Sequence, residues 1–168
     1  QLNRNKRSIA VDIKEKQGKD LFKLLAEEAD VLVEGYRPKA MTGLGLGYEA
    51  LAASNPGLVY CSISSYGSEG PLADRPGTEL DVQVLAGNNR HLGVAGMPPL
   101  RVGFDMASVN AAWSAVQGIL SALYRRERGG GGQRVEISLL NSLITVWQGS
   151  IAAESQPDAW EGRHLTGY

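Results

Sequence analysis

Short apolar runs alternate with helical patterns over residues 8–64, and this alternation constrains the fold more than any other feature. Residues 8–13 alternate apolar and polar side chains, which predicts a strand. Residues 30–34 and 58–64 are short apolar runs of the kind found in buried parallel strands. Helical patterns separate these three runs. The resulting strand–helix–strand–helix–strand order predicts an α/β fold with a parallel sheet and right-handed crossovers.

The predicted helices carry apolar side chains at helical spacing. In residues 16–29 the stripe contains Leu21, Leu24 and Leu25, with charged side chains opposite. The longest helix is expected over about residues 107–127, where the stripe consists of Val109, Trp113, Val116, Ile119 or Leu120, and Leu123. Further helices are expected after Pro38, over residues 48–54, from Glu79 and over about 139–153, and a further strand over 133–137.

Glycine-rich segments in this chain indicate helix ends. Gly129–Gly132 stand between a helix and a strand, whereas a P-loop follows a strand, opens a helix and carries a lysine. Gly43, Gly45 and Gly47 also follow a helix, and their spacing differs from G-x-G-x-x-G. A dinucleotide site is therefore not expected in these segments. Thr78 is expected to cap the helix that begins at Glu79.

The charges are balanced, with 17 basic and 18 acidic side chains and a formal net charge of −1. This balance argues against a nucleic-acid partner. One local basic cluster contains Arg4, Lys6 and Arg7, and it is either a solvated edge or a phosphate contact. No apolar run reaches the roughly 20 residues that span a bilayer, so we expect a cytoplasmic protein with no membrane segment.

Residues that could bind a metal are sparse. The two histidines, His91 and His164, have no partner at metal-ligand spacing, so no metal site is expected. Cys61 is the only cysteine and lies in an apolar run, which favours a buried small hydrophobic side chain.

Two small polar residues, Asp105 and Ser108, lie where the longest helix is expected to begin. The first turn of a helix gathers unpaired N–H groups and the positive end of the helix dipole, which suits anion binding or acyl chemistry. Asp105 is either a helix cap or a functional carboxylate. Ser108 by itself favours first-turn packing or a secondary cap, because no histidine or lysine is near it in sequence to activate it.

Taken together, segments along the chain resemble the family III CoA-transferases of the formyl-CoA and carnitine CoA-transferase type. The resemblance lies in residues 3–14, 29–38, 44–51, 55–60, 70–77, 98–103, 118–123 and 132–140, which occur in the family's order. It implies a Rossmann-like sheet with flanking helices, part of a larger fold of two interlocked chains. Residues 1–153 would then be a large domain that lacks its N-terminal segment, and residues 154–168 the start of a linker to a second domain.

The resemblance also implies an activity and its substrates. Family members transfer CoA between carboxylic acids, with acyl-CoA and an acceptor acid as substrates, no permanently bound cofactor, and two identical chains in a homodimer. An aspartate carboxylate attacks the thioester and forms a mixed anhydride, and the CoA thiolate then attacks that anhydride. A non-catalytic acyl-CoA-binding homologue or subunit is the alternative.

The resemblance assigns the family's functional positions to particular residues. The nucleophilic aspartate falls on Ser108, and Asp105 is a possible substitute because residues i and i+3 are neighbours on a helix. The CoA-contacting positions fall on Lys14, Gly35, Tyr36 and Leu44. The racemase branch of the family needs a histidine at Thr78 and an aspartate at Ser108, so transfer is favoured over racemisation.

Overall fold

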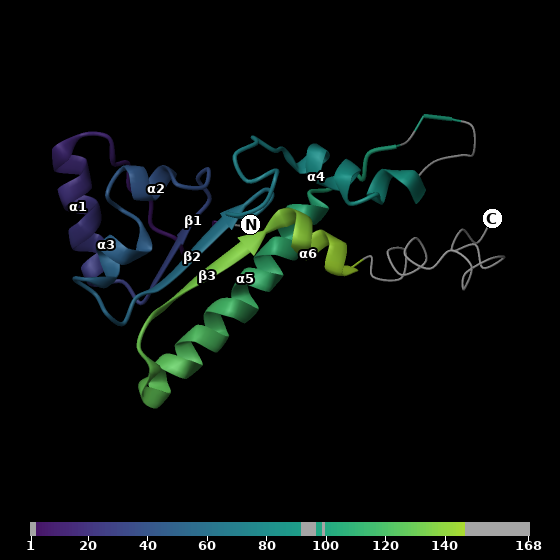
Figure 1. Ribbon diagram of the computed structural model, residues 1–168. Coiled ribbons are helices and arrows are strands. Elements are labelled where there is room, and N and C mark those ends of the chain that lie inside the picture. Colours follow the sequence, from purple (N-terminus) through teal and green to yellow (C-terminus); the bar gives the residue numbers. More distant parts are fainter. Residues whose placement is uncertain (1–2, 92–96, 99, 147–168) are drawn as a thin grey trace.

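The computed structural model describes residues 3–91, 97–98 and 100–146, and Figure 1 shows their arrangement. Within these ranges three strands form one parallel sheet in the order β1-β2-β3. The elements in chain order are α1 (Lys16–Glu27), β1 (Val31–Glu34), α2 (Ala40–Gly43), α3 (Tyr48–Ala52), β2 (Val59–Ser64), α4 (Glu79–Leu85), η1 (Asn88–His91), α5 (Met106–Arg125), η2 (Arg126–Gly130), β3 (Gln133–Ser138) and α6 (Leu139–Val146). The predicted α/β fold with a parallel sheet is confirmed. The expected remainder of the last helix and residues 154–168 lie outside the described ranges.

The long helix α5 covers one face of the sheet and runs along β2 and β3 (Figure 1). Close contact is possible because Gly118 has no side chain: a Cβ there would lie 2.7 Å from a methyl carbon of Val135. Cys61 is fully buried in the central strand, as the sequence predicts. The opposite face of β3 carries Arg134 and Glu136 and is polar there, while Leu32 and Tyr60 on the same face of β1 and β2 pack into an apolar cluster.

Two apolar clusters hold the elements together. The first joins α1 and α3 to β1 and β2, and consists of Ala26, Leu51, Leu58 and Tyr60 with Phe22, Ala29, Leu32 and Tyr48 around them. The second joins α4, α5 and α6, and consists of Val82, Ala107 and Leu143 with Tyr66, Ala86, Met106, Leu139 and Leu140. Since α6 follows β3 directly, the second cluster lies beyond the carboxyl end of that strand, next to the start of α5 (Figure 1).

The helix faces that contact the sheet are not the ones predicted. The buried side chains of α5 are alanines, whereas Trp113 is 65% and Leu120 60% exposed. Leu21, Leu24 and Leu25 of α1 are also exposed. An alanine face lets a helix lie close to a sheet, and among the described residues no element covers the larger side chains. The two predicted stripes therefore form exposed apolar surfaces.

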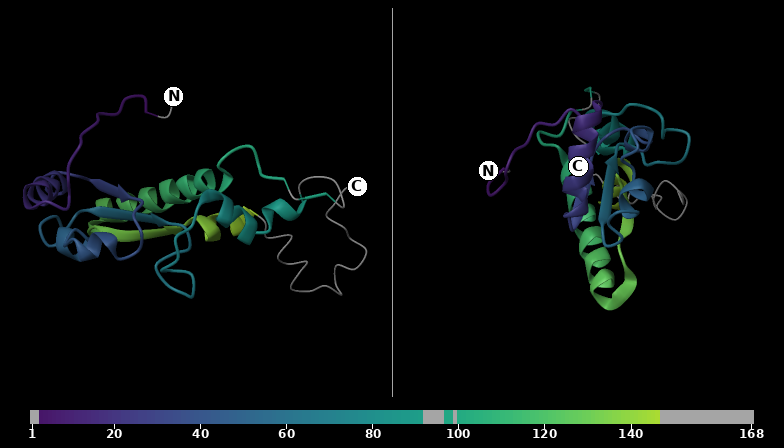
Figure 2. Two further views of the ribbon diagram at one scale, coloured as in Figure 1. Left: turned by 90° about the horizontal axis from the view of Figure 1, so that it is seen from above. Right: turned by 90° about the vertical axis from the view of Figure 1, so that its left-hand side faces the viewer.

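The first predicted strand is absent from the structure. Residues 8–13 form an irregular segment that arches away from the sheet (Figure 2), and Ile9 is 66% exposed. The alternating pattern is present, but within the described residues no neighbouring strand offers it a ladder of hydrogen bonds. The prediction of a strand there was wrong for that reason.

Two predictions about helix ends are confirmed, the cap at Thr78 and the turn at Gly129–Gly132. Thr78 forms a capping box with Asp81, whose backbone N–H donates to the threonine hydroxyl and whose carboxylate accepts from the threonine backbone. Gly129 and Gly131 have φ values of 85° and 71°, a region that favours glycine, and they turn the chain from α5 into β3.

Candidate active site at the start of α5

The start of α5 lies beside α4 and α6, beyond the carboxyl end of β3. Ligands of parallel α/β sheets bind outside the carboxyl ends of the strands, so this position suits a functional site. A cavity of about 380 Å³ opens along the same edge of the sheet, between the segments that follow β1 and β2, and its lining includes Gly35, Tyr36, Tyr66 and Gly77. Gly77 is two residues before Glu79, which begins α4.

Glu79 places a carboxylate on the first turn of α5. Its Oε1 accepts a hydrogen bond from the backbone N–H of Ala107 at 2.6 Å. Its Oε2 accepts from the backbone N–H of Ser108 at 2.9 Å and from the Ser108 hydroxyl at 2.6 Å. The carboxylate therefore occupies the N–H groups that a helix start leaves unpaired, and it holds the Ser108 side chain in place.

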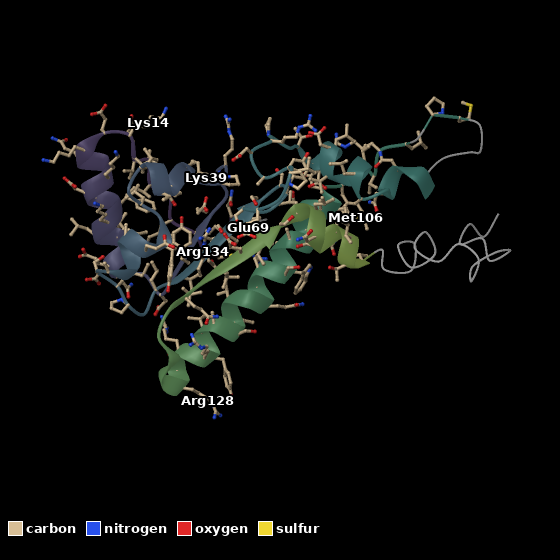
Figure 3. The ribbon with its side chains drawn as sticks, viewed as in Figure 1. Lys14, Lys39, Glu69, Met106, Arg128 and Arg134 are labelled. Atoms are coloured by element: carbon tan, nitrogen blue, oxygen red, sulfur yellow. The ribbon has the colours of Figure 1, made fainter. Side chains whose placement is uncertain are left out.

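Two buried amide side chains, Gln83 and Asn88, hold the residues around this carboxylate. Gln83 is fully buried, and its Nε2 donates to Glu79 Oε1 at 2.8 Å and to the carbonyl of Phe104 at 3.3 Å. Asn88 is also fully buried, and its Nδ2 donates to the sulfur of Met106 at 3.1 Å. These contacts fix the start of α5 relative to α4 and η1. Figure 3 labels Met106 at this position.

Burial and hydrogen bonding act in opposite directions on the Glu79 carboxyl. Burial raises its pKa, but hydrogen bonds from Ser108, Gln83 and the backbone of Ala107 outweigh burial, and the pKa lies below the usual value for glutamate. The group is therefore ionised at neutral pH.

Asp105 is the residue before α5, but its carboxylate does not cap the helix. It points to Arg101 instead, at 3.5 Å, and 66% of its side chain is exposed. The interpretation of Asp105 as a helix cap is therefore wrong. Among the described residues, the hydrogen bonds of the Ser108 hydroxyl and backbone N–H go to Glu79 and not to Asp105.

The residues that the family resemblance assigns to CoA contacts fall at three places in the structure. Gly35 and Tyr36 directly follow β1 and line a groove of about 1110 Å³, together with Lys6 and Arg7. Lys14 precedes α1 and is exposed, and Figure 3 shows it far from Met106. Leu44 follows α2 and is half-buried.

The polar face of the sheet holds a third cavity, of about 380 Å³. Arg134 pairs with Glu136 there, and the Ser68 hydroxyl donates to Glu136 at 3.0 Å. Burial raises the pKa of Glu34 in the same cavity, against the opposing effects of the Tyr36 backbone and of Arg134. Arg134 and Glu136 therefore balance each other's charge, and the Glu34 carboxylate accepts a hydrogen bond from the Tyr36 backbone N–H at 2.7 Å.

The described residues contain neither a metal-binding cluster nor a membrane-spanning helix. Over residues 3–91, 97–98 and 100–146, no three side chains of the metal-ligating types come together. None of the described helices is both long and apolar enough to cross a bilayer. His164 lies outside the described residues.

Sequence reasoning missed Glu79. It is 29 residues from Ser108, and its position in the sequence marks it only as the first residue after a cap. The contact arises because α4 packs against the start of α5, which no local pattern reveals. The hydrophobic positions of both helices are the only signal that could have suggested the pairing.

Comparison with known proteins identifies the family. The model of CoA-transferase family III matches residues 1–166. An acyl-CoA transferase of Fusarium pseudograminearum is 39% identical over 145 residues, which are 86% of this chain and 32% of that protein. A succinyl-CoA–D-citramalate CoA-transferase of Chloroflexus aurantiacus is 35% identical over 150 residues, 89% of this chain and 37% of that protein. The chain thus spans about a third of the length of these relatives.

Solved structures agree with the sequence comparison. A CAIB/BAIF family protein from Brucella suis superposes with a TM-score of 0.85 at 32% identity, over 90% of this chain and 40% of that one. Rv3272 from M. tuberculosis superposes with a TM-score of 0.86 at 30% identity, over 92% of this chain and 43% of that one. The match to the family model and the shared fold lead to one conclusion: this chain belongs to CoA-transferase family III.

Proposed function

We propose that this chain is part of the large domain of a longer cytoplasmic enzyme that transfers CoA from an acyl-CoA to a carboxylic acid. Family membership is the observation that carries the proposal. The names of the relatives support it, since they include transferases of succinyl-CoA and of formyl-CoA with oxalate. CoA is a substrate in this reaction, and the proposal includes no permanently bound cofactor.

We place the reacting centre at the start of α5. The resemblance assigns the family's nucleophile position to Ser108, and the positive end of the α5 dipole stabilises negative charge there. Lys14, Gly35, Tyr36 and Leu44 are the proposed CoA contacts. The large groove beside Gly35 and Tyr36 favours this placement of CoA, because Lys6 and Arg7 give it positive charge.

The test is an exchange assay with the full-length parent protein. An acyl-CoA is mixed with isotopically labelled carboxylic acids, and labelled thioester is measured. The proposal predicts a labelled thioester for at least one acid. If neither Ser108→Ala nor Asp105→Ala lowers the rate of an active enzyme, the nucleophile position assigned by the resemblance is wrong.

One observation favours a second function. A serine stands at the nucleophile position, and its hydroxyl is engaged with Glu79. A non-catalytic homologue that binds acyl-CoA, alone or as a subunit, would carry such a change. Binding of acyl-CoA by the full-length protein, without exchange for any acid and without gain of exchange in Ser108→Asp, would establish this alternative.

We also propose that the full-length protein is an interlocked homodimer, as the resemblance implies. The exposed apolar surface of α5, with Val109, Trp113, Val116, Leu120 and Tyr124, supports an interface. Light scattering of the full-length protein during gel filtration should give the mass of a dimer. A monomer at micromolar concentration would contradict the proposal.

A further inference from the structure

The carboxylate nearest to Ser108 in the structure belongs to Glu79, which the family resemblance does not single out. We infer that Glu79 is the catalytic carboxylate of this chain, the group that becomes acylated, while Ser108 serves it as a hydrogen-bond donor. The inference rests on the proposed function, because it names the reacting group of that transfer.

Geometry distinguishes Glu79 from Asp105 as the carboxylate at this site. The Glu79 oxygens lie within 2.6–2.9 Å of the Ser108 hydroxyl and of the two backbone nitrogens at the start of α5. The Asp105 carboxylate pairs with Arg101 and makes no described hydrogen bond to the helix start. A nucleophile at the family's position must act where Ser108 lies, and Glu79 is the carboxylate there.

The helix start can also stabilise the intermediates on this carboxylate. When a thiolate attacks a glutamyl carbonyl carbon, one oxygen of the former carboxylate becomes an oxyanion. The N–H groups of Ala107 and Ser108 already donate to the two carboxylate oxygens, so a donor is in place for either one. In many acyl-transfer enzymes, hydrogen-bond donors that are fixed before the reaction make the largest single contribution to stabilising the transition state.

The surroundings keep Glu79 ionised and oriented. Its pKa lies below the usual glutamate value, since hydrogen bonds outweigh the effect of burial, so the nucleophilic form dominates at neutral pH. Buried Gln83 donates to Oε1 and leaves Oε2 facing Ser108. Glu79 itself is half-buried, so part of its side chain reaches the surface.

The first half-reaction then proceeds in two steps. A Glu79 oxygen attacks the carbonyl carbon of the acyl-CoA, a C–O bond forms, the C–S bond breaks, and CoA leaves as a thiolate with the electron pair. The thiolate next attacks the glutamyl carbonyl carbon of this mixed anhydride. A C–S bond forms, the anhydride C–O bond breaks, and the donor acid leaves as a carboxylate.

The second half-reaction repeats these steps with the acceptor. Its carboxylate attacks the glutamyl thioester and expels the CoA thiolate, which then attacks the acceptor carbonyl of the new anhydride. The products are the acceptor acyl-CoA and the free Glu79 carboxylate. No proton, oxidant or reductant is consumed, so the residues described here and the two substrates suffice.

Hydroxylamine trapping in the full-length protein tests the inference. Hydroxylamine converts a glutamyl thioester or anhydride into a hydroxamate that peptide mass spectrometry detects. Trypsin cleaves after Arg90 and Arg101, so Glu79 falls in one peptide, and Asp105 and Ser108 in another. The inference predicts an acyl-CoA-dependent hydroxamate on the peptide that contains Glu79. A hydroxamate on the other peptide would overturn it.

Variants give a second readout. Glu79→Gln should lower kcat at least about a thousandfold and abolish the hydroxamate, whereas Ser108→Ala should lower kcat about ten- to a hundredfold and retain it. The control is Glu27→Gln, an exposed change on α1, which should leave both unchanged. Glu79→Gln with undiminished exchange would overturn the inference, and circular dichroism of each variant excludes loss of fold as the cause.

The two proposals fail in different ways. If the wild-type protein exchanges no acid, the proposed function fails and the inference fails with it. If the wild-type protein exchanges acids but the hydroxamate forms on the peptide with Asp105, or Glu79→Gln stays active, only the role of Glu79 is wrong.

Discussion

Replacing Ser108 by aspartate would set two carboxylates against each other at the start of α5. The Ser108 hydroxyl now lies 2.6 Å from Glu79 Oε2 and donates to it. An aspartate at position 108 would direct a negatively charged oxygen toward the same Oε2. The matched control is Ser108→Asn, which has nearly the same shape, remains neutral and can still donate a hydrogen bond.

The size of the effect follows from Coulomb's law. Two unit charges ~4 Å apart repel by about 1 kcal/mol in water and about 4 kcal/mol at an effective dielectric constant near 20. Ser108 is exposed and Glu79 half-buried, so the repulsion lies toward the lower end, about 1–2 kcal/mol. Attraction between the new charge and the positive end of the helix dipole offsets roughly 0.3–1 kcal/mol of this repulsion. At neutral pH, Ser108→Asp should therefore be about 1 kcal/mol less stable than Ser108→Asn.

The difference should depend on pH in a definite direction. The pair relieves its repulsion by binding a proton, so one carboxyl in Ser108→Asp has a pKa above its unfolded value. A raised pKa means that stability falls as pH rises, because the folded state holds more protons than the unfolded state. Urea unfolding between about pH 4 and about pH 8 should show the gap widening with pH.

Two results would be incompatible with a contact between residue 108 and Glu79. The gap between Ser108→Asp and Ser108→Asn could be independent of pH, or Ser108→Asp could be the more stable variant at about pH 8. Either result would show that residue 108 does not face the Glu79 carboxylate.

Three further predictions concern the packing of the sheet and the cap of α4. Gly132→Ala should lower the free energy of unfolding, measured with urea, by about 1–3 kcal/mol, because a Cβ there would meet the backbone of Leu58. The control is Gly43→Ala, which has open space around it and should change the free energy of unfolding little. Burial raises the pKa of Cys61 to about 11, so its thiol should resist alkylation at neutral pH in the folded protein and react only when the protein is unfolded. Rapid alkylation of the native protein would contradict the burial of this thiol. Thr78→Ala removes a capping box and should cost about 1 kcal/mol in the same unfolding assay; an unchanged midpoint would mean that the cap contributes nothing.

The sequence predicted the described sheet well, because its signals are local. The apolar runs at 30–34 and 58–64, together with the alternating run at 133–137, mark all three described strands, and the helices between them fix their parallel direction. The predicted strand at 8–13 failed because a strand also needs a neighbour, which its own sequence does not supply. The stripe of α5 was misjudged because alanine, and not the larger Trp113, lies against the sheet.

The candidate site was predicted only in part. The start of α5 and the position of Ser108 came from the helix pattern and the family resemblance. Glu79 could not be predicted, because its partner is 29 residues away and depends on how α4 packs. The expected cap at Asp105 was wrong because its carboxylate pairs with Arg101, four residues earlier in the chain.

A crystal structure of the full-length protein with an unreactive acyl-CoA analogue would show which carboxylate faces the acyl group. We expect the analogue's acyl carbon to lie about 3–3.5 Å from a Glu79 oxygen, beside the first turn of α5. Ser108 should still donate to that carboxylate. An acyl group facing Asp105, or lying in the cavity of Arg134 and Glu136 on the polar face of the sheet, would rule out Glu79 as the reacting group.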